Sequence, residues 1–433
     1  MKQGDKESRI VSLLQNEGLV GSGDISEKFC ISRSTLARWL SNISQKWVSI
    51  GNTRNIRYGL LRQITGLDSE LPLYRINSQG KILLVGKLAA LYQKFCVVKP
   101  QDQVFTGLPP EIADMSPQGF MGRAFARKYS GELNLPPRLE DWSGDHFLKA
   151  IALRGEDLPG NLIVGKESAE RWQKIVYQPT RRSSFNKLAE LALQEQPAGS
   201  SAGGERPKFS VWMQGKHALV KFAGPSNLPE QKRWRDLLYC EAIASSILQK
   251  AGIDSASTKI SESDGFTFLE VTRFDRLGEK GRRPVLNLAG VDDFLFGERD
   301  SWANAAERLY QNKLLSKEDA KKIKLLDAFS RLIGDTDRHF YNVCLFPTFE
   351  SEESLTPKFY ELAPSFDKTP MIFAPVNGQI IDRDFKMELP GAELFEVWNE
   401  ALNLAQIFWA EVAGEKRVSF SFRKIASKCL EAL

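Results

Sequence analysis

The segment GDTDRHFYNVCLF, residues 334–346, constrains the fold of this chain more than any other stretch of its 433 residues. It lies between an apolar helix that ends in FSRLI and a predicted strand that begins after Asn342. Asp337 and Asn342 stand five positions apart in it. A single pair with this spacing is common by chance, because a capped turn with a solvated aspartate gives the same pattern. Its meaning therefore depends on the polar residues elsewhere in the chain.

A lysine and a glutamate stand in apolar surroundings upstream. Residues 209–222 predict a hairpin, and its second strand carries Lys221 between two apolar neighbours. Such a lysine can also lie at a sheet edge with its ammonium group in solvent. The helix predicted over residues 233–250 places Glu241 on its apolar face, where an unpaired carboxylate would be costly. Lys221 is therefore the expected partner of Glu241, unless Glu241 lies at the edge of that face and is solvated.

A glycine-rich loop precedes the hairpin. Residues 199–208, GSSAGGERPK, follow a predicted helix at 185–194 and contain three glycines and two serines. Glycine allows close approach of backbone N–H groups to phosphates, because it has no Cβ and tolerates positive φ. A flexible linker has a similar composition. The candidate ATP-binding residues of this loop are Ser200, Ser201, Ala202, Gly203 and Gly204.

The order of these features is that of a protein kinase. The loop, Lys221, Glu241 and the Asp-x4-Asn segment are followed by Asp367 in FYELAPSFDKTP. In kinases the lysine binds ATP phosphates and pairs with the glutamate, the first aspartate orients or deprotonates the substrate hydroxyl, and the asparagine and later aspartate bind Mg²⁺. The set predicts an α+β, two-lobed protein-kinase-like fold with ATP and Mg²⁺ as cofactors.

The stretches SSAGGERPK, RFDR, TDRHFYN and LAPSFD resemble signature sequences of HipA-family serine/threonine kinases, and the resemblance covers most of residues 110–433. It implies the following roles: Asp337 as catalytic base, Lys221 as phosphate-binding lysine with Glu241 as its pair, Asn342 and Asp367 as Mg²⁺ ligands, and Ser200 as a site of inhibitory autophosphorylation. Asp335 stands two residues before Asp337, so the choice of the base rests on the spacing to Asn342.

The adenine site is expected near TRFDR, residues 272–276, where the chain would cross between the two lobes. Phe274 is the candidate to pack on the base. An aromatic residue at the end of a strand belongs more often to the core, so both interpretations of Phe274 stay open.

The first 62 residues resemble a winged helix-turn-helix domain. Spacing of apolar residues predicts helices at 9–17, 22–29 and 32–43, with Ser22 or Asp24 capping the second, and then a hairpin within 47–62 around the turn GNTRN. In such domains the third helix enters the major groove and the wing touches the DNA backbone.

Arginines predicted on the solvent side favour duplex DNA as the partner of this domain. The candidate DNA-binding residues are Arg33, Ser34, Thr35 and Arg38 on the third helix and Arg54 and Arg57 on the wing. The net charge of +5 is small for this length, so DNA affinity has to come from such a local cluster. The alternative is a structural cap that only supports the rest of the chain.

Typical HipA-family members bind a separate DNA-binding antitoxin, whereas this chain carries its own helix-turn-helix, similar to the YjjJ/HipH-type branch. A HipB-like antitoxin is thus an open expectation, beside a protein substrate and a second copy of the chain. The predicted domains are a winged helix at 1–62, a kinase N-lobe with a HipA-type N-terminal subdomain at 63–275, and a mostly helical C-lobe at 276–433.

Composition argues against several other classes of protein. Five cysteines without a C-x-x-C pair and only three histidines argue against a disulfide framework and a zinc site. A polar N-terminus and the lack of a long apolar run predict a cytoplasmic protein, at the nucleoid if it binds DNA, and no membrane partner. A DNA-binding regulator with a nucleotide-sensing or inactive kinase-like fold is the main alternative, and small-molecule or nucleic-acid acceptors stay open.

Overall fold

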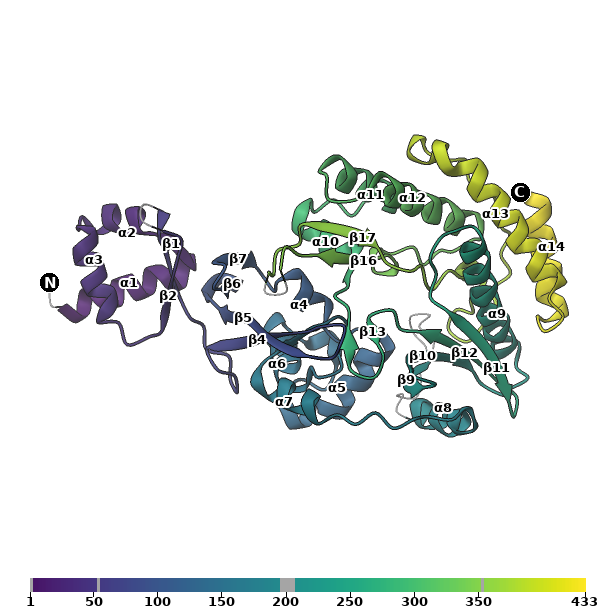
Figure 1. Cartoon of the computed structure of the whole chain (residues 1–433), viewed down its shortest axis with the longest axis horizontal. Coiled ribbons are helices and arrows are strands. Elements are labelled where there is room, and N and C mark those ends of the chain that lie inside the picture. The colour runs from purple at the N-terminus through teal and green to yellow at the C-terminus, as the bar shows by residue number, and fades with distance from the viewer. Residues whose placement is uncertain (1–2, 53–54, 195–206, 352–353) are drawn as a thin grey trace.

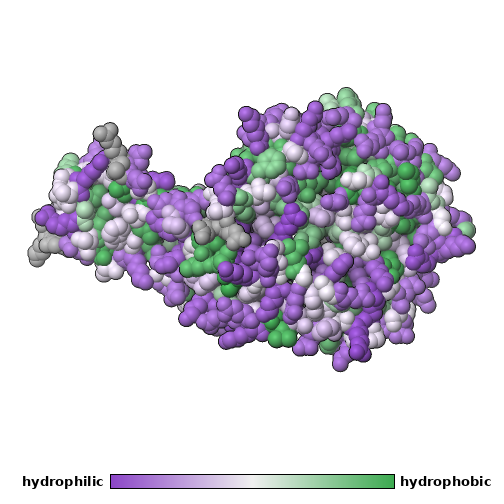
Figure 2. Space-filling model, in the orientation of Figure 1, coloured by the Kyte–Doolittle hydropathy of each residue, from purple (hydrophilic) through white to green (hydrophobic). Residues whose placement is uncertain are grey.

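The computed structural model describes residues 3–52, 55–194, 207–351 and 354–433. A small N-terminal domain lies at one end of an elongated molecule, and a narrow connection joins it to a larger body that ends in α14 (Figure 1). The face in Figure 2 is mainly hydrophilic, with smaller apolar patches. Within the described ranges, no helix has the length and apolar character needed to cross a membrane. The predicted residues Arg54, Ser200, Ser201, Ala202, Gly203 and Gly204 lie outside these ranges.

The N-terminal domain contains three helices and a three-stranded sheet. Its elements are α1 (Gln3–Glu17), β1 (Leu19–Gly21), α2 (Ser22–Phe29), α3 (Arg33–Ser41), β2 (Trp47–Ile50) and β3 (Arg57–Leu60), with antiparallel strands in the order β1-β3-β2. The predicted helices and hairpin are confirmed, although α1 begins six residues earlier than expected. The predicted cap of α2 is wrong, because the N-cap residue is Gly21 and no side chain accepts its N–H groups.

Apolar packing fixes this domain on the next one. Leu36 and Leu40 of α3 are buried in the core of the small domain. Val48 and Ile50 pack instead with Leu91 and Val97, which belong to the following sheet. The Lys99 ammonium group also donates to the Ser49 carbonyl at 2.6 Å. The wing hairpin is therefore held by the body of the molecule.

The middle part of the chain forms a five-stranded antiparallel sheet with helices. It comprises β4 (Glu70–Ile76), β5 (Ile82–Ala90), β6 (Phe95–Lys99), β7 (Gln103–Thr106), α4 (Pro110–Asp114), α5 (Gly119–Leu133), α6 (Gly144–Arg154), β8 (Leu162–Val164) and α7 (Lys166–Lys174). The strand order is β7-β6-β5-β4-β8, so the last strand pairs with the first, Leu73 opposite Val164.

A second antiparallel sheet carries Lys221. Its region comprises α8 (Phe185–Gln194), β9 (Lys208–Met213), β10 (Lys216–Ala223), α9 (Pro229–Lys250), β11 (Thr258–Ser263) and β12 (Phe266–Thr272), with strand order β11-β12-β10-β9. The turns Gln214-Gly215 and Asp264-Gly265 have positive φ at both residues, as tight hairpins need. The helix predicted at 185–194 is confirmed. Both sheets fall within the predicted segment 63–275.

The C-terminal part is mostly helical. After the short pair β13 (Arg276–Leu277) and β14 (Gly281–Arg282) come β15 (Leu286–Asn287), α10 (Leu288–Leu295), α11 (Trp302–Gln311), α12 (Lys317–Leu332), β16 (Cys344–Thr348), β17 (Phe359–Leu362), α13 (Phe395–Gly414) and α14 (Phe420–Ala432). The largest apolar core joins α9, α12, α13 and α14, and Figure 1 shows these helices together at the C-terminal end. The Asp337 loop lies between α12 and the β16–β17 hairpin. This order of elements agrees with the predicted α+β, two-lobed kinase-like architecture.

Candidate active site

The predicted pair between Lys221 and Glu241 is confirmed as a contact. Lys221 Nζ lies 2.6 Å from Glu241 Oε1, and the two residues are 4 % and 2 % exposed. Lys221 projects from β10 and Glu241 from the middle of α9, with their positions fixed by the apolar residues around them. Since a buried charge is tolerated only when paired, the strand and helix are tied together at this point.

The same ammonium group contacts Asp367. Lys221 Nζ lies 2.8 Å from Asp367 Oδ1, across 146 positions of the chain. Asp367 follows β17 with a φ of 57°, a left-handed conformation that aspartate adopts more readily than most residues. One lysine therefore joins two carboxylates from different parts of the fold, and the Asp367 side chain stays 30 % exposed.

Hydrogen bonds to backbone carbonyls hold the Asp337 loop in place. The Asp337 carbonyl accepts from the Asn342 side-chain amide at 2.8 Å and from the His339 N–H at 2.9 Å. The Asn342 carbonyl accepts from Lys368 Nζ at 3.1 Å, which links the loop to the residue after Asp367. The Asp337 carboxylate is 51 % exposed and lies at an open cavity of about 350 Å³. A carboxylate so placed can contact a substrate group.

Asp335 is distinguished from Asp337 by its burial. It is 0 % exposed, and its Oδ1 accepts the N–H of Asp337 at 3.0 Å. Its Oδ2 has no hydrogen-bond partner among the described residues. Burial raises the pKa of Asp335 to about 7, and the nearby Lys368 ammonium opposes this rise. Asp335 therefore lies on the buried side of the loop and holds the Asp337 backbone by a hydrogen bond.

Sequence reasoning missed Lys368. Its ammonium group is buried and lies 4.3 Å from the centre of the Trp302 ring, a cation–π contact. Burial lowers the pKa of Lys368, while Asp335 and Asp367 raise it. The only signal in the sequence was its place next to Asp367, which does not distinguish a buried lysine from a solvated one.

Phe274 lies in an aromatic cluster between the two lobes. Its ring centre is 5.8 Å from that of Phe346 and 5.7 Å from that of Phe366. Phe366 directly precedes Asp367, so Phe274 contacts the segment that carries the site. The neighbouring Asp275 is buried and accepts from Arg273 and Arg276. The RFDR stretch thus connects the two lobes through these aromatic contacts and ion pairs.

Comparison with known proteins identifies the family. Residues 67–173 match the family model described as YjjJ-like toxin, middle domain, and residues 200–432 match the HipA-like C-terminal domain. The chain is also 32 % identical over 441 residues to the toxin YjjJ of Escherichia coli strain K12, covering 98 % of this chain and 97 % of that protein.

The chain belongs to the YjjJ-like branch of the HipA toxin family.

A solved structure shows that the family fold is present here. HipA of Shewanella oneidensis MR-1, solved with HipB and its operator DNA, aligns with a TM-score of 0.54 at 15 % identity and covers 84 % of this chain and 96 % of that chain. The HipA-type kinase-like fold predicted from the sequence is therefore confirmed.

The predicted DNA-binding residues of this HipA-family chain lie apart from the Asp337 loop, on the surface of the small domain. Arg33, Ser34 and Arg38 of α3 and Arg57 of β3 are exposed, and Thr35 is partly buried. Ser32 caps α3 by accepting the Thr35 N–H at 3.2 Å. None of these arginines forms an ion pair with the described residues.

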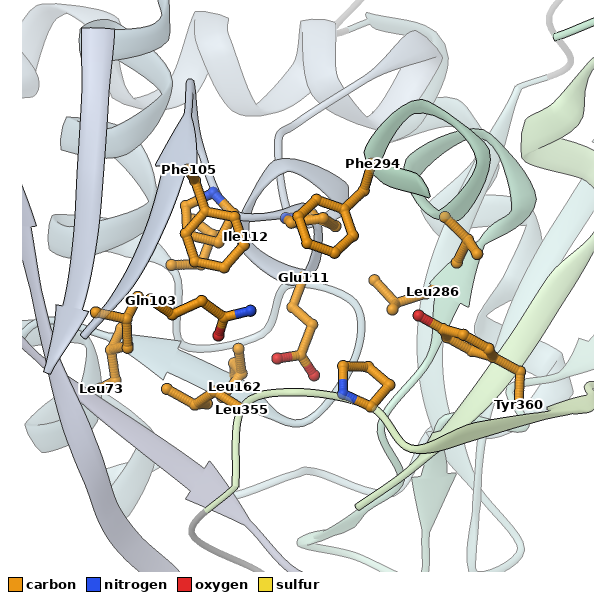
Figure 3. Close-up of a pocket in the computed structure, with 15 residues that line it drawn as sticks. Leu73, Gln103, Phe105, Glu111, Ile112, Leu162, Leu286, Phe294, Leu355 and Tyr360 are labelled. Carbon is orange, nitrogen blue, oxygen red and sulfur yellow. The ribbon is translucent and has the colours of Figure 1, made fainter. Parts of the chain in front are cut away.

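A second cavity lies where the middle sheet meets the C-terminal part. Apolar side chains from both sides surround about 30 Å³, room for about two water molecules. In Figure 3, Glu111 reaches into this space between Gln103 and Tyr360. Burial raises the pKa of Glu111, and Arg75, 3.4 Å away, opposes the rise. No predicted site residue lines this cavity, so we assign it to the contact between the middle sheet and the C-terminal part of the chain.

Proposed function

We propose that this HipA-family protein is an Mg-ATP-dependent serine/threonine protein kinase whose N-terminal domain binds duplex DNA. The observation that carries the proposal is the buried contact of Lys221 with both Glu241 and Asp367. A structural ion pair needs one carboxylate, whereas a lysine between Glu241 of α9 and Asp367, which follows β17, matches the kinase arrangement. Nucleotide phosphates would take the place of the Asp367 carboxylate at Lys221.

Each residue of the site has a role that its surroundings support. Asp337 would orient the acceptor hydroxyl and accept its proton, since its carboxylate is exposed at a cavity while that of Asp335 is buried. Glu241 would hold Lys221 in position for the ATP phosphates, and Phe274 would line the adenine side. When bound, Mg-ATP supplies the phosphoryl group and a metal that neutralises charge on it.

The residues present fit a magnesium ion. Asp367 and the side-chain carbonyl of Asn342 are oxygen donors, which Mg²⁺ prefers. The Asn342 amide nitrogen is occupied by the Asp337 carbonyl, which leaves the amide oxygen for another partner. Two protein ligands suffice, because Mg²⁺ at such sites keeps waters and takes phosphate oxygens as its other ligands.

Regulation and partners follow from the family resemblance. Phosphorylation of Ser200 would add a charge of about −1.5 to −2 beside the ATP phosphates and silence the enzyme. The S. oneidensis HipA structure includes HipB and operator DNA. By analogy, a HipB-like antitoxin is the proposed partner of this chain. The form that binds DNA would be a homodimer, located in the cytoplasm or at the nucleoid. The proposed boundaries remain 1–62, 63–275 and 276–433.

Labelled ATP tests the enzyme directly. The full chain is incubated with γ-labelled ATP and Mg²⁺ in lysate of its host, beside the Asp337→Asn variant. The expected result is labelled protein bands with the wild type that are missing with the variant, and label on serine or threonine after hydrolysis. ATP binding without any transfer would instead identify a nucleotide-sensing regulator.

A further inference from the structure

An exposed segment follows the proposed site residue Asp367. Residues 376–389, here called the acceptor strip, belong to no helix or strand, apart from an isolated bridge at Val376 and Gln379. Thirteen of these 14 residues are exposed, and Phe385 is the partly buried one. The strip is thus an irregular stretch of chain, with a turn at residues 377–378, that offers most of its side chains to a partner.

The strip is unusually apolar for such exposure. It holds five of the 18 large apolar side chains that are exposed in the described parts of the chain, so 14 residues account for more than a quarter of them. These are Val376, Ile380, Ile381, Met387 and Leu389, the last 83 % exposed. Single exposed apolar residues are ordinary, whereas a group of them marks an interaction site.

The strip is anchored beside the Asp337 loop. The Phe385 ring lies 6.1 Å from that of Trp409 in the main core. Arg383 donates to the Ile372 carbonyl at 3.1 Å, and the Ile372 N–H donates to the Gly334 carbonyl at 2.9 Å. Gly334 has a φ of 73°, and a Cβ there would lie 2.7 Å from Ile372, so the contact is close. The segment that carries Asp337 begins at this point.

Charge around the strip and the Asp337 cavity is negative. The cavity is lined by Asp300, Asp327, Asp337, Arg331 and Arg338, and the strip adds Asp382, Asp384, Glu388, Arg383 and Lys386. Glu393, four residues after the strip, lies 3.8 Å from Arg331 of the cavity. Asp300 pairs with Arg308 at 2.9 Å and the buried Asp327 pairs with Arg331, so the negative excess comes from the strip, where three carboxylates stand against two cations, and from the exposed Asp337. Such a surface repels a nucleic acid and attracts a basic partner.

We propose that the acceptor strip binds the phosphate acceptor as an extended polypeptide segment in which apolar and basic side chains flank the serine or threonine. Apolar side chains of the acceptor would pack on Ile380, Ile381 and Leu389, and its basic side chains would face Asp382, Asp384 and Glu388. The serine or threonine hydroxyl would then reach Asp337 in the adjoining cavity. This inference rests on the proposed kinase function and makes it more specific.

Three serine peptides of equal length test the proposal with the full chain and Mg-ATP. One carries arginine and leucine around the serine, the second glutamate and leucine, and the third arginine and glutamine. We expect kcat/KM for the first peptide to exceed the other two at least tenfold. Equal values, or a preference for the acidic or polar peptide, would overturn the proposal.

Variants of the strip separate its apolar and acidic parts. Ile381→Ser/Leu389→Ser and Asp382→Asn/Asp384→Asn should each lower kcat/KM for the first peptide at least fivefold, and the second effect should shrink in 0.5 M salt. ATP hydrolysis without peptide should stay unchanged. Ile407→Ser is the control, because Ile407 is 40 % exposed on α13 outside the strip. Unchanged peptide kinetics in both variants would refute the assignment.

Other occupants give different results. If the strip variants convert a dimer to a monomer in light scattering and leave peptide kinetics unchanged, the strip is a self-association surface and the proposal is wrong. Transfer to proteins in lysate but to no peptide would also overturn it. If the wild type transfers no phosphate at all, the kinase proposal fails, and fluorescence anisotropy of the same labelled peptides then decides whether the strip binds them.

Discussion

The proposed active site and the proposed DNA-binding surface differ in how their charged residues are held. Lys221 and Glu241 are almost completely buried and contact each other, whereas Arg33, Arg38 and Arg57 are exposed. A buried charge without a partner destabilises a fold by several kcal/mol, so the residues of the first group require one another. An exposed arginine has no such requirement.

This difference determines how strongly each proposal is constrained by the fold. At the proposed active site, folding itself brings Lys221, Glu241 and Asp367 together. On α3, folding fixes only that one helix face is exposed, and a partner has to supply the counter-charge. Changes at Lys221 or Glu241 should therefore affect both activity and stability, and changes at the second site should affect only binding.

The largest effect is expected for Asp337→Asn. Loss of the proposed base should lower phosphoryl transfer by about 10²- to 10⁴-fold. Because the Asp337 side chain is 51 % exposed, the urea unfolding midpoint should stay unchanged. Asp68→Asn, which changes another exposed aspartate, is the control and should keep full activity. Turnover near that of the wild type in Asp337→Asn would remove Asp337 from the mechanism.

A smaller effect, on stability, is expected for Glu241→Gln. The change removes the charge of one of the two carboxylates that contact the buried Lys221, and we expect the free energy of unfolding to fall by about 2–3 kcal/mol. The control is Glu411→Gln, because the Lys250–Glu411 pair is exposed at 3.5 Å, and its loss should cost less than about 0.5 kcal/mol. Equal urea midpoints for the two variants would mean that burial does not distinguish the pairs.

The sequence predicted those contacts that follow from local pattern. The Lys221–Glu241 pair could be predicted because a carboxylate on an apolar helix face needs a cation, and the hairpin over residues 209–222 because its turn contains Gly215, which tolerates positive φ. The contact of Lys221 with Asp367 could not, because 146 positions separate them and only the packed fold fixes their distance.

Two other features depended on packing that the sequence does not reveal. Nothing local distinguishes the buried Asp335 from the exposed Asp337, because the burial of Asp335 depends on residues far along the chain. The five-stranded sheet was hardly predicted beyond short strands, because its closing pair joins Leu73 to Val164 and leaves no local periodic signal.

Asp335 offers a test of pH dependence. Its pKa is about 7 in the folded protein against an ordinary value of 3.8, so between these values the folded state binds a proton that the unfolded state releases. Stability should therefore decrease as the pH rises through this window, by about 2 kcal/mol between pH 5 and pH 8 from this group. Asp335→Asn should remove that decrease and match the wild type only near pH 5.

Urea midpoints of both proteins at pH 5, 6, 7 and 8 provide the measurement. The pKa of Asp114 is also about 7, so it contributes to the slope of both proteins, and only their difference reports on Asp335. Parallel curves would show that Asp335 is charged in the folded state throughout this range, with Lys368 as its counter-ion.

The smallest effect is expected on the DNA-binding surface. If Arg38 and Arg57 contact phosphates, the double alanine variant should weaken binding of duplex DNA about three- to tenfold at low salt and reduce the slope of log K against log salt by roughly two. Folding should be unaffected, because both residues are exposed. Arg33→Ala should instead change the preference among sites, if its side chain reaches base edges.

Fluorescence anisotropy of the full chain with genomic duplex fragments at several salt concentrations checks these expectations. Lys28→Ala is the matched control, because Lys28 is an exposed cation of the same domain that pairs with Glu17 at 3.0 Å and lies outside α3 and the wing. If Lys28→Ala lowers the slope by about one, which is the share expected of each arginine in the double variant, binding follows overall charge and not a defined surface. If the wild type does not bind DNA at low salt, the domain is a protein-contact module. The wing is already held against the body of the molecule by the hydrogen bond from Lys99 to Ser49. The exposed arginines are then expected to contact acidic side chains of a protein partner.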